Sequence, residues 1–136
     1  MKNNSLEKFF DFKNKVVLIT GCNGQIGNDI VNLFLDLKSK VYGIDKVGKK
    51  RNKDFNFING DITKESQIKK IIKRIILKEK SIDIIINNAG VSTFTNFKKR
   101  SKNELEKIFN TNVASVINII KNYVIQFDKK KLKKGK

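Results

Sequence analysis

A glycine-rich segment directly after a short apolar run constrains the fold of this chain more than any other feature. The run ends at Thr20, and three glycines follow it as an amphipathic helical pattern begins. In the order strand, glycine loop and helix, backbone N–H groups at the helix N-terminus face an anion such as a diphosphate. We therefore predict a phosphate-binding turn made by Gly21, Asn23, Gly24, Gln25, Ile26 and Gly27.

Strands and helices are predicted to alternate along the rest of the chain. Short apolar runs predict strands, and apolar residues at helical spacing predict the segments between them. This alternation predicts an α/β fold, a Rossmann-like doubly wound parallel sheet of about four strands in the order 3-2-1-4, with helices on both faces. The predicted strands are 15–20, 40–45, 55–59 and 82–87, and the predicted helices are 25–38, 64–78 and 101–128.

Local signals mark where these helices begin and which faces they bury. Thr63 is the expected N-cap of the second helix, and Ser101 with Glu104 forms a capping-box pattern at the start of the third. Asn112 lies on the apolar stripe of the third helix, where a buried amide must be hydrogen-bonded. The expected apolar faces are Ile26, Ile30, Leu33, Phe34 and Leu37 in the first helix, and Ile68, Ile71, Ile72 and Ile75 in the second.

Composition excludes several classes of protein. At 136 residues the chain fits one domain, predicted as 1–136 with a basic tail at 129–136. It has no histidine, which excludes Ser-His-Asp and Cys-His nucleophiles as well as His/Cys zinc sites, so no metal is expected. Its single cysteine, Cys22, excludes an internal disulfide. Without a long apolar stretch or a signal-peptide core, we expect no membrane contact and a cytoplasmic location.

The formal net charge of +17 raises the question of nucleic-acid binding. Three arginines leave 27 lysines among the 30 basic residues, whereas phosphate forks and base readout favour arginine. Lysine, asparagine and isoleucine share A/T-rich codons and proline does not, so a biased genome explains a lysine-rich chain without proline. We therefore do not favour nucleic acid as a partner, although the lysines of 129–136 keep that alternative open.

Polar and small residues follow the second, third and fourth predicted strands, at the same edge of the sheet. In their order and spacing, these residues together with the glycine loop and Asn112 resemble the short-chain dehydrogenase/reductase family over residues 12–128. The residues that carry the resemblance after these strands are Asp45, Lys46, Asp61, Ile62, Asn87, Asn88, Ala89 and Gly90.

The resemblance implies that this chain is the dinucleotide-binding portion of an NAD-dependent oxidoreductase. Asp45 would accept the adenosine ribose hydroxyls and repel a 2′-phosphate, which favours NAD over NADP. Lys46 and the nearby Lys49, Lys50 and Arg51 blur that preference, because these cations could neutralise a phosphate. Asp61 would bond the adenine amine and Ile62 would cover the ring; alternatively, Asp61 only shapes a turn at the helix entry. The small residues from Asn88 to Gly90 would let the backbone pass close to the cofactor ribose.

Whether this chain can be active depends on which of the family's catalytic residues it contains. Asn112 would open its helix and hold a water of a proton relay, or else be a core asparagine bonded to neighbouring backbone. The catalytic Ser and Tyr-x-x-x-Lys would lie beyond residue 128, and Tyr123 is not that tyrosine because Phe127 stands four residues later. In the family a hydride moves between nicotinamide and a carbonyl or alcohol substrate, yet we expect this chain alone to be inactive. The alternative is a non-catalytic dinucleotide-binding or interaction module, with a homo-oligomer formed through helix 101–128.

Overall fold

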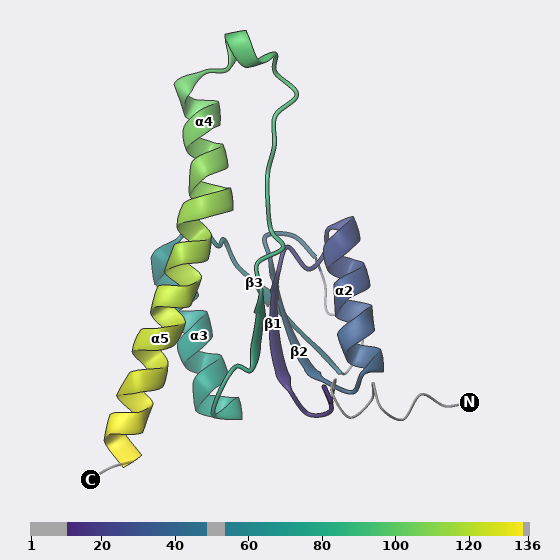
Figure 1. Ribbon diagram of the computed structural model, residues 1–136, viewed down its shortest axis with the longest axis vertical. Coiled ribbons are helices and arrows are strands. Elements are labelled where there is room, and N and C mark those ends of the chain that lie inside the picture. The colour runs from purple at the N-terminus through teal and green to yellow at the C-terminus, as the bar shows by residue number, and fades with distance from the viewer. Residues whose placement is uncertain (1–10, 49–53, 135–136) are drawn as a thin grey trace.

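A parallel β-sheet with helices on both faces forms the centre of the molecule (Figure 1). The computed structural model describes residues 11–48 and 54–134, with side chains described up to residue 129. All strand pairs are parallel and the order is β3-β2-β1-β4, which confirms the predicted sheet. The strands are β1 (Val16–Thr20), β2 (Lys40–Asp45), β3 (Phe55–Asn59) and β4 (Ile84–Ile86).

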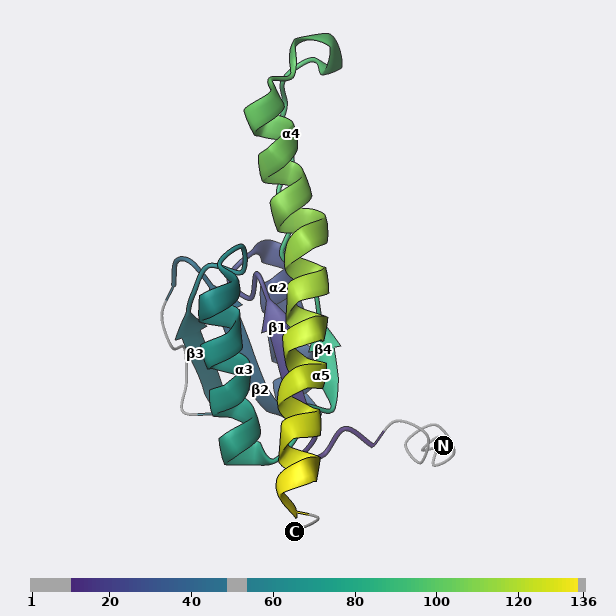
Figure 2. The same cartoon turned by 90° about the vertical axis from the view of Figure 1, so that its left-hand side faces the viewer.

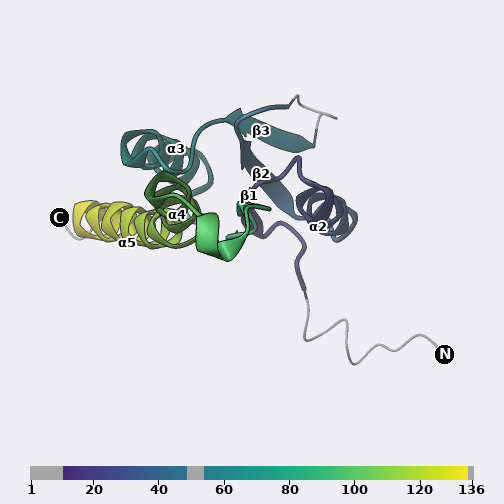
Figure 3. The ribbon, with the colours of Figure 1, turned by 90° about the horizontal axis from the view of Figure 1, so that it is seen from above.

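The helices form one layer on each face of the sheet. Helix α2 (Gln25–Asp36) covers one face, and α3 (Glu65–Glu79) lies beside α5 (Ser115–Lys134) on the other (Figures 2 and 3). The chain between β4 and α5 rises beyond the sheet and contains the short 3-10 turn η1 (Phe97–Lys99), α4 (Lys102–Phe109) and the π-helical segment η2 (Asn110–Ala114). In the described part of the chain, no helix is long and apolar enough to cross a membrane.

Alternation along β1 divides the core into two apolar layers. Val17 and Ile19 pack with Val31 and Phe34 of α2, whereas Val16 and Leu18 belong to the layer under α3 and α5. Successive strand residues point to opposite faces, so a strand covered on both faces is apolar throughout. The same layer takes in the predicted apolar face of α3, namely Ile68, Ile71, Ile72 and Ile75, together with Ile76.

Several predicted boundaries and faces differ from the structure. Helix α2 ends at Asp36, two residues early, because Lys38 adopts a left-handed conformation with φ of 61°. Strand β4 is limited to Ile84–Ile86, the three residues that pair with β1. In α2 the buried residues are Gly27, Val31 and Phe34, whereas Ile26 and Leu33 of the predicted face are 69% and 55% exposed.

Two predictions about helix ends are corrected. Lys64, and not Thr63, is the N-cap of α3, because the Thr63 hydroxyl donates to Asp61 Oδ1 at 2.7 Å. The capping box of Ser101 and Glu104 is present at α4. The long helix is interrupted by η2 and continues to Lys134, so most of the predicted 129–136 tail is helical backbone.

Candidate functional site

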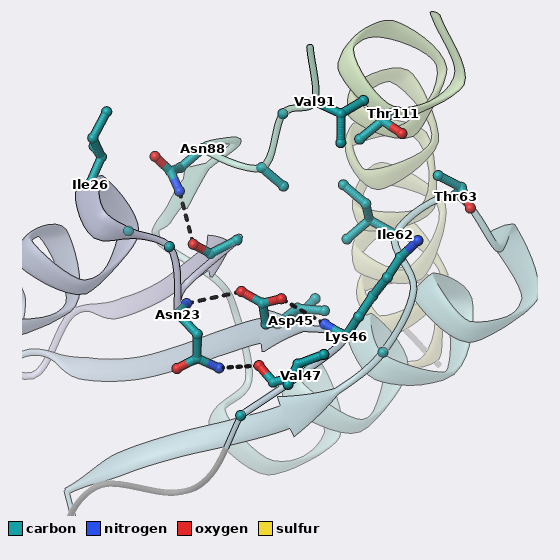
Figure 4. A pocket seen from close by; sticks show the side chains of 18 of the residues that line it. Asn23, Ile26, Asp45, Lys46, Val47, Ile62, Thr63, Asn88, Val91 and Thr111 are labelled. Atoms are coloured by element: carbon teal, nitrogen blue, oxygen red, sulfur yellow. Dashed lines mark hydrogen bonds between the residues drawn. The ribbon is translucent and has the colours of Figure 1, made fainter. Parts of the chain in front are cut away.

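A pocket of about 1220 Å³ opens at the carboxyl ends of the strands (Figure 4). It lies between the neighbouring strands β1 and β4, where the strand order reverses, which is the switch point at which doubly wound sheets bind ligands. Twelve of the fourteen predicted site residues line it, and Asp61 and Asn112 do not. The twelve are Gly21, Asn23, Gly24, Gln25, Ile26, Gly27, Asp45, Lys46, Ile62, Asn88, Ala89 and Gly90.

The three glycines of the turn meet different steric demands. Gly21 has φ of +64°, and a Cβ there would lie 2.8 Å from Ala89 Cα. A Cβ on Gly27 would lie 2.0 Å from the Gly21 carbonyl oxygen, so α2 packs against the turn at backbone distance. A Cβ on Gly24 would meet only that same oxygen, at 3.4 Å, which is an ordinary contact. The fold therefore does not require a glycine here, and the missing side chain leaves space in the pocket.

Asn88 joins the end of β4 to the glycine turn. Its Nδ2 donates to the carbonyl oxygens of Thr20 and Gly21, both at 3.1 Å, and the Ala89 N–H donates to the Thr20 hydroxyl at 3.0 Å. These bonds bring Ala89 against Gly21 of the turn, and both Ala89 and Gly90 line the pocket. The segment after β4 therefore packs against the glycine turn, and its approach to a cofactor ribose stays a prediction.

Asp45 is oriented by the backbone around it. Its Oδ2 accepts the Asn23 N–H at 3.0 Å and its Oδ1 accepts the Lys46 N–H at 2.8 Å. The Asn23 side chain continues the network by donating to the Val47 carbonyl at 2.7 Å (Figure 4). A carboxylate has about four acceptor positions, so Asp45 retains capacity for two hydroxyl donors at the pocket edge.

Asp61 forms the turn that leads into α3. Its Oδ1 accepts the Thr63 N–H at 2.9 Å and the Thr63 hydroxyl, and Lys46 Nζ lies 3.1 Å from its Oδ2. Burial favours a higher pKa for Asp61, but the Thr63 hydrogen bonds and Lys46 outweigh it and hold that pKa below 3.8. The two Thr63 hydrogen bonds match the turn-forming alternative, the ion pair with Lys46 is a further contact, and Ile62 lines the pocket.

Asn112 is exposed, which corrects its predicted burial. Its Oδ1 accepts the Val91 N–H and its Nδ2 donates to the Val91 carbonyl, both at 2.9 Å. The side chain thus ties the segment after β4 to η2, where the helix is locally widened as expected. The bond to neighbouring backbone matches the alternative interpretation of Asn112, although the residue is not in the core.

Two features of the site were not anticipated from the sequence. Tyr42 and Lys46 have Tyr-x-x-x-Lys spacing, but four residues along a strand span roughly 13 Å, too far for a joint role. The Tyr42 hydroxyl is buried and donates to Glu79 Oε1 at 2.6 Å. Helices α4 and η2 also supply pocket residues, Lys107, Asn110 and Thr111, which their position near Asn112 in the sequence could have indicated.

Comparisons with known proteins agree with this geometry. The model of the short chain dehydrogenase family matches residues 15–136. A short chain dehydrogenase from Leptospira borgpetersenii, solved with bound NAD+, is 31% identical with a TM-score of 0.82, and the match covers 96% of this chain and 51% of that one. The ligand-free aldohexose dehydrogenase of Thermoplasma acidophilum is 28% identical with a TM-score of 0.79, and the match covers 86% and 46%.

A curated relative gives the same picture. Dehydrogenase RED2 of Cochliobolus heterostrophus is 26% identical over 128 residues, which cover 91% of this chain and 48% of that protein. The chain therefore spans about half the length of these relatives. Because the family match begins at the first strand and runs through the sheet and every segment that lines the pocket, this chain belongs to the short-chain dehydrogenase family of oxidoreductases.

Proposed function

We propose that this chain binds NAD, with the pyrophosphate against the glycine turn and the adenosine ribose at Asp45. The observation that carries the proposal is Gly24, whose missing side chain opens the N-terminus of α2 to the pocket. Free N–H groups at that end of the helix favour a phosphate. The bound NAD+ of the Leptospira relative adds support, because that protein shares the fold of this chain.

Asp45 supports NAD over NADP as the ligand. The carboxylate is fixed at the end of β2 by the N–H groups of Asn23 and Lys46, and its remaining acceptor positions suit the two ribose hydroxyls. A 2′-phosphate at that place would bring two like charges together in a partly enclosed pocket. Ile62 supplies an apolar surface in the same pocket for the adenine ring.

We further propose that the whole protein transfers a hydride between nicotinamide and a carbonyl or alcohol substrate, and that these 136 residues alone do not turn over. When bound, the nicotinamide supplies or accepts the hydride. This chain's residues hold and orient the dinucleotide, and Asn112 orders the segment after β4 beside it. Neither Tyr42 nor Tyr123 supports acid–base work, because their hydroxyls are engaged by Glu79 and by the Ile82 carbonyl. A cytoplasmic location belongs to the same proposal.

Calorimetric titration with NAD tests the binding, using Gly24→Ala as the informative variant. The backbone at Gly24 has φ of −66° and ψ of 164°, which alanine adopts freely, so we expect a folded protein. The added methyl group stands where the diphosphate would approach, so NAD affinity should fall at least tenfold. Asp29→Ala, on the exposed part of the same helix, is the matched control and should bind as the unmodified chain does.

Absence of NAD binding by folded protein, or equal affinity in Gly24→Ala, would contradict the proposed site. A circular dichroism melt of each variant confirms that the comparison concerns folded chains. Activity assays on these residues alone should stay at background with any alcohol or carbonyl substrate, and measurable turnover would overturn the second part of the proposal.

A non-catalytic interaction module is the second candidate, and one observation favours it. The helix that runs through α4, η2 and α5 carries large apolar side chains exposed to solvent, which is typical of a surface that another chain covers. These apolar side chains are Leu105, Phe109, Val113, Ile117, Ile120, Val124 and Ile125. A homo-oligomer formed through this helix is compatible with either function.

A further inference from the structure

An ion pair at the edge of the pocket bears on the choice between NAD and NADP. Lys46 follows Asp45 directly, and its Nζ lies 3.1 Å from Asp61 Oδ2. The Lys46 side chain extends from the end of β2 across to the segment of Ile62 and Thr63 (Figure 4). A lysine beside the expected ribose position could receive a 2′-phosphate. The preference for NAD or NADP therefore depends on whether another group already neutralises the Lys46 ammonium.

Hydrogen bonds hold the backbone of Lys46 and the carboxylate of Asp61, while the Lys46 side chain is 60% exposed. The Lys46 N–H donates to Asp45 Oδ1 at 2.8 Å, and the Lys46 carbonyl accepts Asn59 Nδ2 at 2.7 Å. On the other side, Thr63 anchors Asp61 Oδ1 with two hydrogen bonds and leaves Oδ2 to face Lys46. The geometry is therefore set at two neighbouring strand ends, those of β2 and β3, and by the turn that leads into α3.

We propose that Asp61 is a specificity-determining residue, which neutralises Lys46 and so favours NAD over NADP. The inference rests on the proposed NAD site. A 2′-phosphate would have to take Lys46 from Asp61 and would then lie between two carboxylates, Asp45 and Asp61. NAD carries no such group, so the Lys46–Asp61 pair stays intact when it binds.

The other charged groups that line the pocket do not replace this device. Lys64 lies three residues after Asp61, and Lys107 belongs to α4. Lys49, Lys50 and Arg51 lie outside the described residues. Of the described lysines that line the pocket, Lys46 is the one next to Asp45 in the sequence, and its carboxylate partner decides whether its charge is available.

The ratio of NADP to NAD affinity, measured by calorimetry, tests the inference. Asp61→Asn keeps an oxygen for the Thr63 hydrogen bonds and removes only the charge, so the ratio should rise about five-fold, the upper range for a solvent-accessible ion pair. Any contact of Asp61 with adenine is common to both ligands and cancels in the ratio. The increase in the ratio should vanish when Asp61→Asn is combined with Lys46→Gln. When Asp61→Asn is combined with Lys64→Gln instead, the increase should remain.

A second variant keeps the test independent of how well Asp61→Asn folds. If Lys46 is neutralised in the unmodified chain, Lys46→Gln should change the ratio less than two-fold. A five-fold fall would show that the Lys46 charge is already available and would overturn the inference, as would an unchanged ratio in folded Asp61→Asn. If the unmodified chain binds neither dinucleotide, both this inference and the proposed function fail, whereas NAD binding with an unchanged ratio defeats this one alone.

Discussion

At Gly27, the absence of a Cβ atom decides whether the turn can form. A Cβ at this position would lie 2.0 Å from the Gly21 carbonyl oxygen and 2.8 Å from Asn88 Nδ2, and the first neighbour is backbone that cannot rotate away. We expect Gly27→Ala to lower the free energy of unfolding by about 3 kcal/mol, as for severe overpacking. Urea denaturation measures this, with Gly24→Ala as the tolerant comparison. Equal stability of the two variants would contradict the steric account.

Tyr42 tests whether a motif spacing can mislead. Its buried hydroxyl donates to Glu79, which also pairs with Lys40 at 2.8 Å, so the residue joins β2 to α3. We expect Tyr42→Phe to cost about 1 kcal/mol of stability, the typical contribution of one hydrogen bond or slightly more for a charged acceptor. NAD affinity should be unchanged. A loss of affinity without a loss of stability would place Tyr42 in the site instead.

Positions relative to strand ends and local capping patterns could be predicted from the sequence, and side-chain partnerships between distant segments could not. The glycine turn and Asp45 follow from positions relative to strand ends, because the carboxyl ends of parallel strands meet at one edge. The Lys46–Asp61 pair joins residues fifteen positions apart, whose separation in space depends on the paired ends of β2 and β3. The locally opened helix at Asn112 was predicted correctly, but its burial was not. Its exposure follows from the way the helix rises beyond the sheet (Figure 1).

At the scale of elements, Glu104 holds the segment between β4 and α4. Its carboxylate accepts hydrogen bonds from the hydroxyls of Thr93 and Thr95 and from Ser101, while Arg100 donates to the Thr95 carbonyl. The Thr95 hydroxyl, followed by the Ser101 backbone and Thr93, lowers the pKa of Glu104 to about 2. One ionised carboxylate therefore orders a segment that lacks regular structure over most of its length.

The order of this segment should depend on pH. Because the pKa of Glu104 in the folded chain lies below its ordinary 4.5, its contribution is complete above about pH 4.5 and is lost as pH falls towards about 2. Amide hydrogen exchange of residues 93–101 should accelerate in that window. Glu104→Gln should show fast exchange already at neutral pH, and Asp29→Ala should behave as the unmodified chain. Unchanged protection down to pH 2 would exclude this role.

Element types could be predicted more accurately than their ends. The four strands were identified as short apolar runs, and the longer helices by apolar side chains repeating every 3.6 residues. It does not indicate that Lys38 turns left-handed and ends α2, nor that five residues around Asn112 adopt π-helical hydrogen bonding. Both depend on contacts with other elements, as the bonds between Asn112 and Val91 show.

At the scale of the whole molecule, two apolar surfaces remain open in the described part of the chain. Strand β4 has β1 on one side and no strand on the other, and an unpaired edge invites another strand. The helix that runs through α4, η2 and α5 exposes a row of apolar side chains. The net charge of +17 opposes association at low salt, so oligomers should strengthen as salt screens it.

Sedimentation velocity separates the two surfaces. Ile117 and Ile120 are 58% and 49% exposed on α5, so changing both to lysine should leave the fold intact and shift a helix-mediated dimer to monomer. Leu77→Lys, at a position 65% exposed on α3, is the matched control for an added surface charge and should leave the dimer unchanged. If the α5 variant still dimerises, the part of the helix around Ile117 and Ile120 does not carry the association, which favours the β4 edge. A monodisperse monomer of the unmodified chain, even at high salt, would mean that neither surface drives self-association.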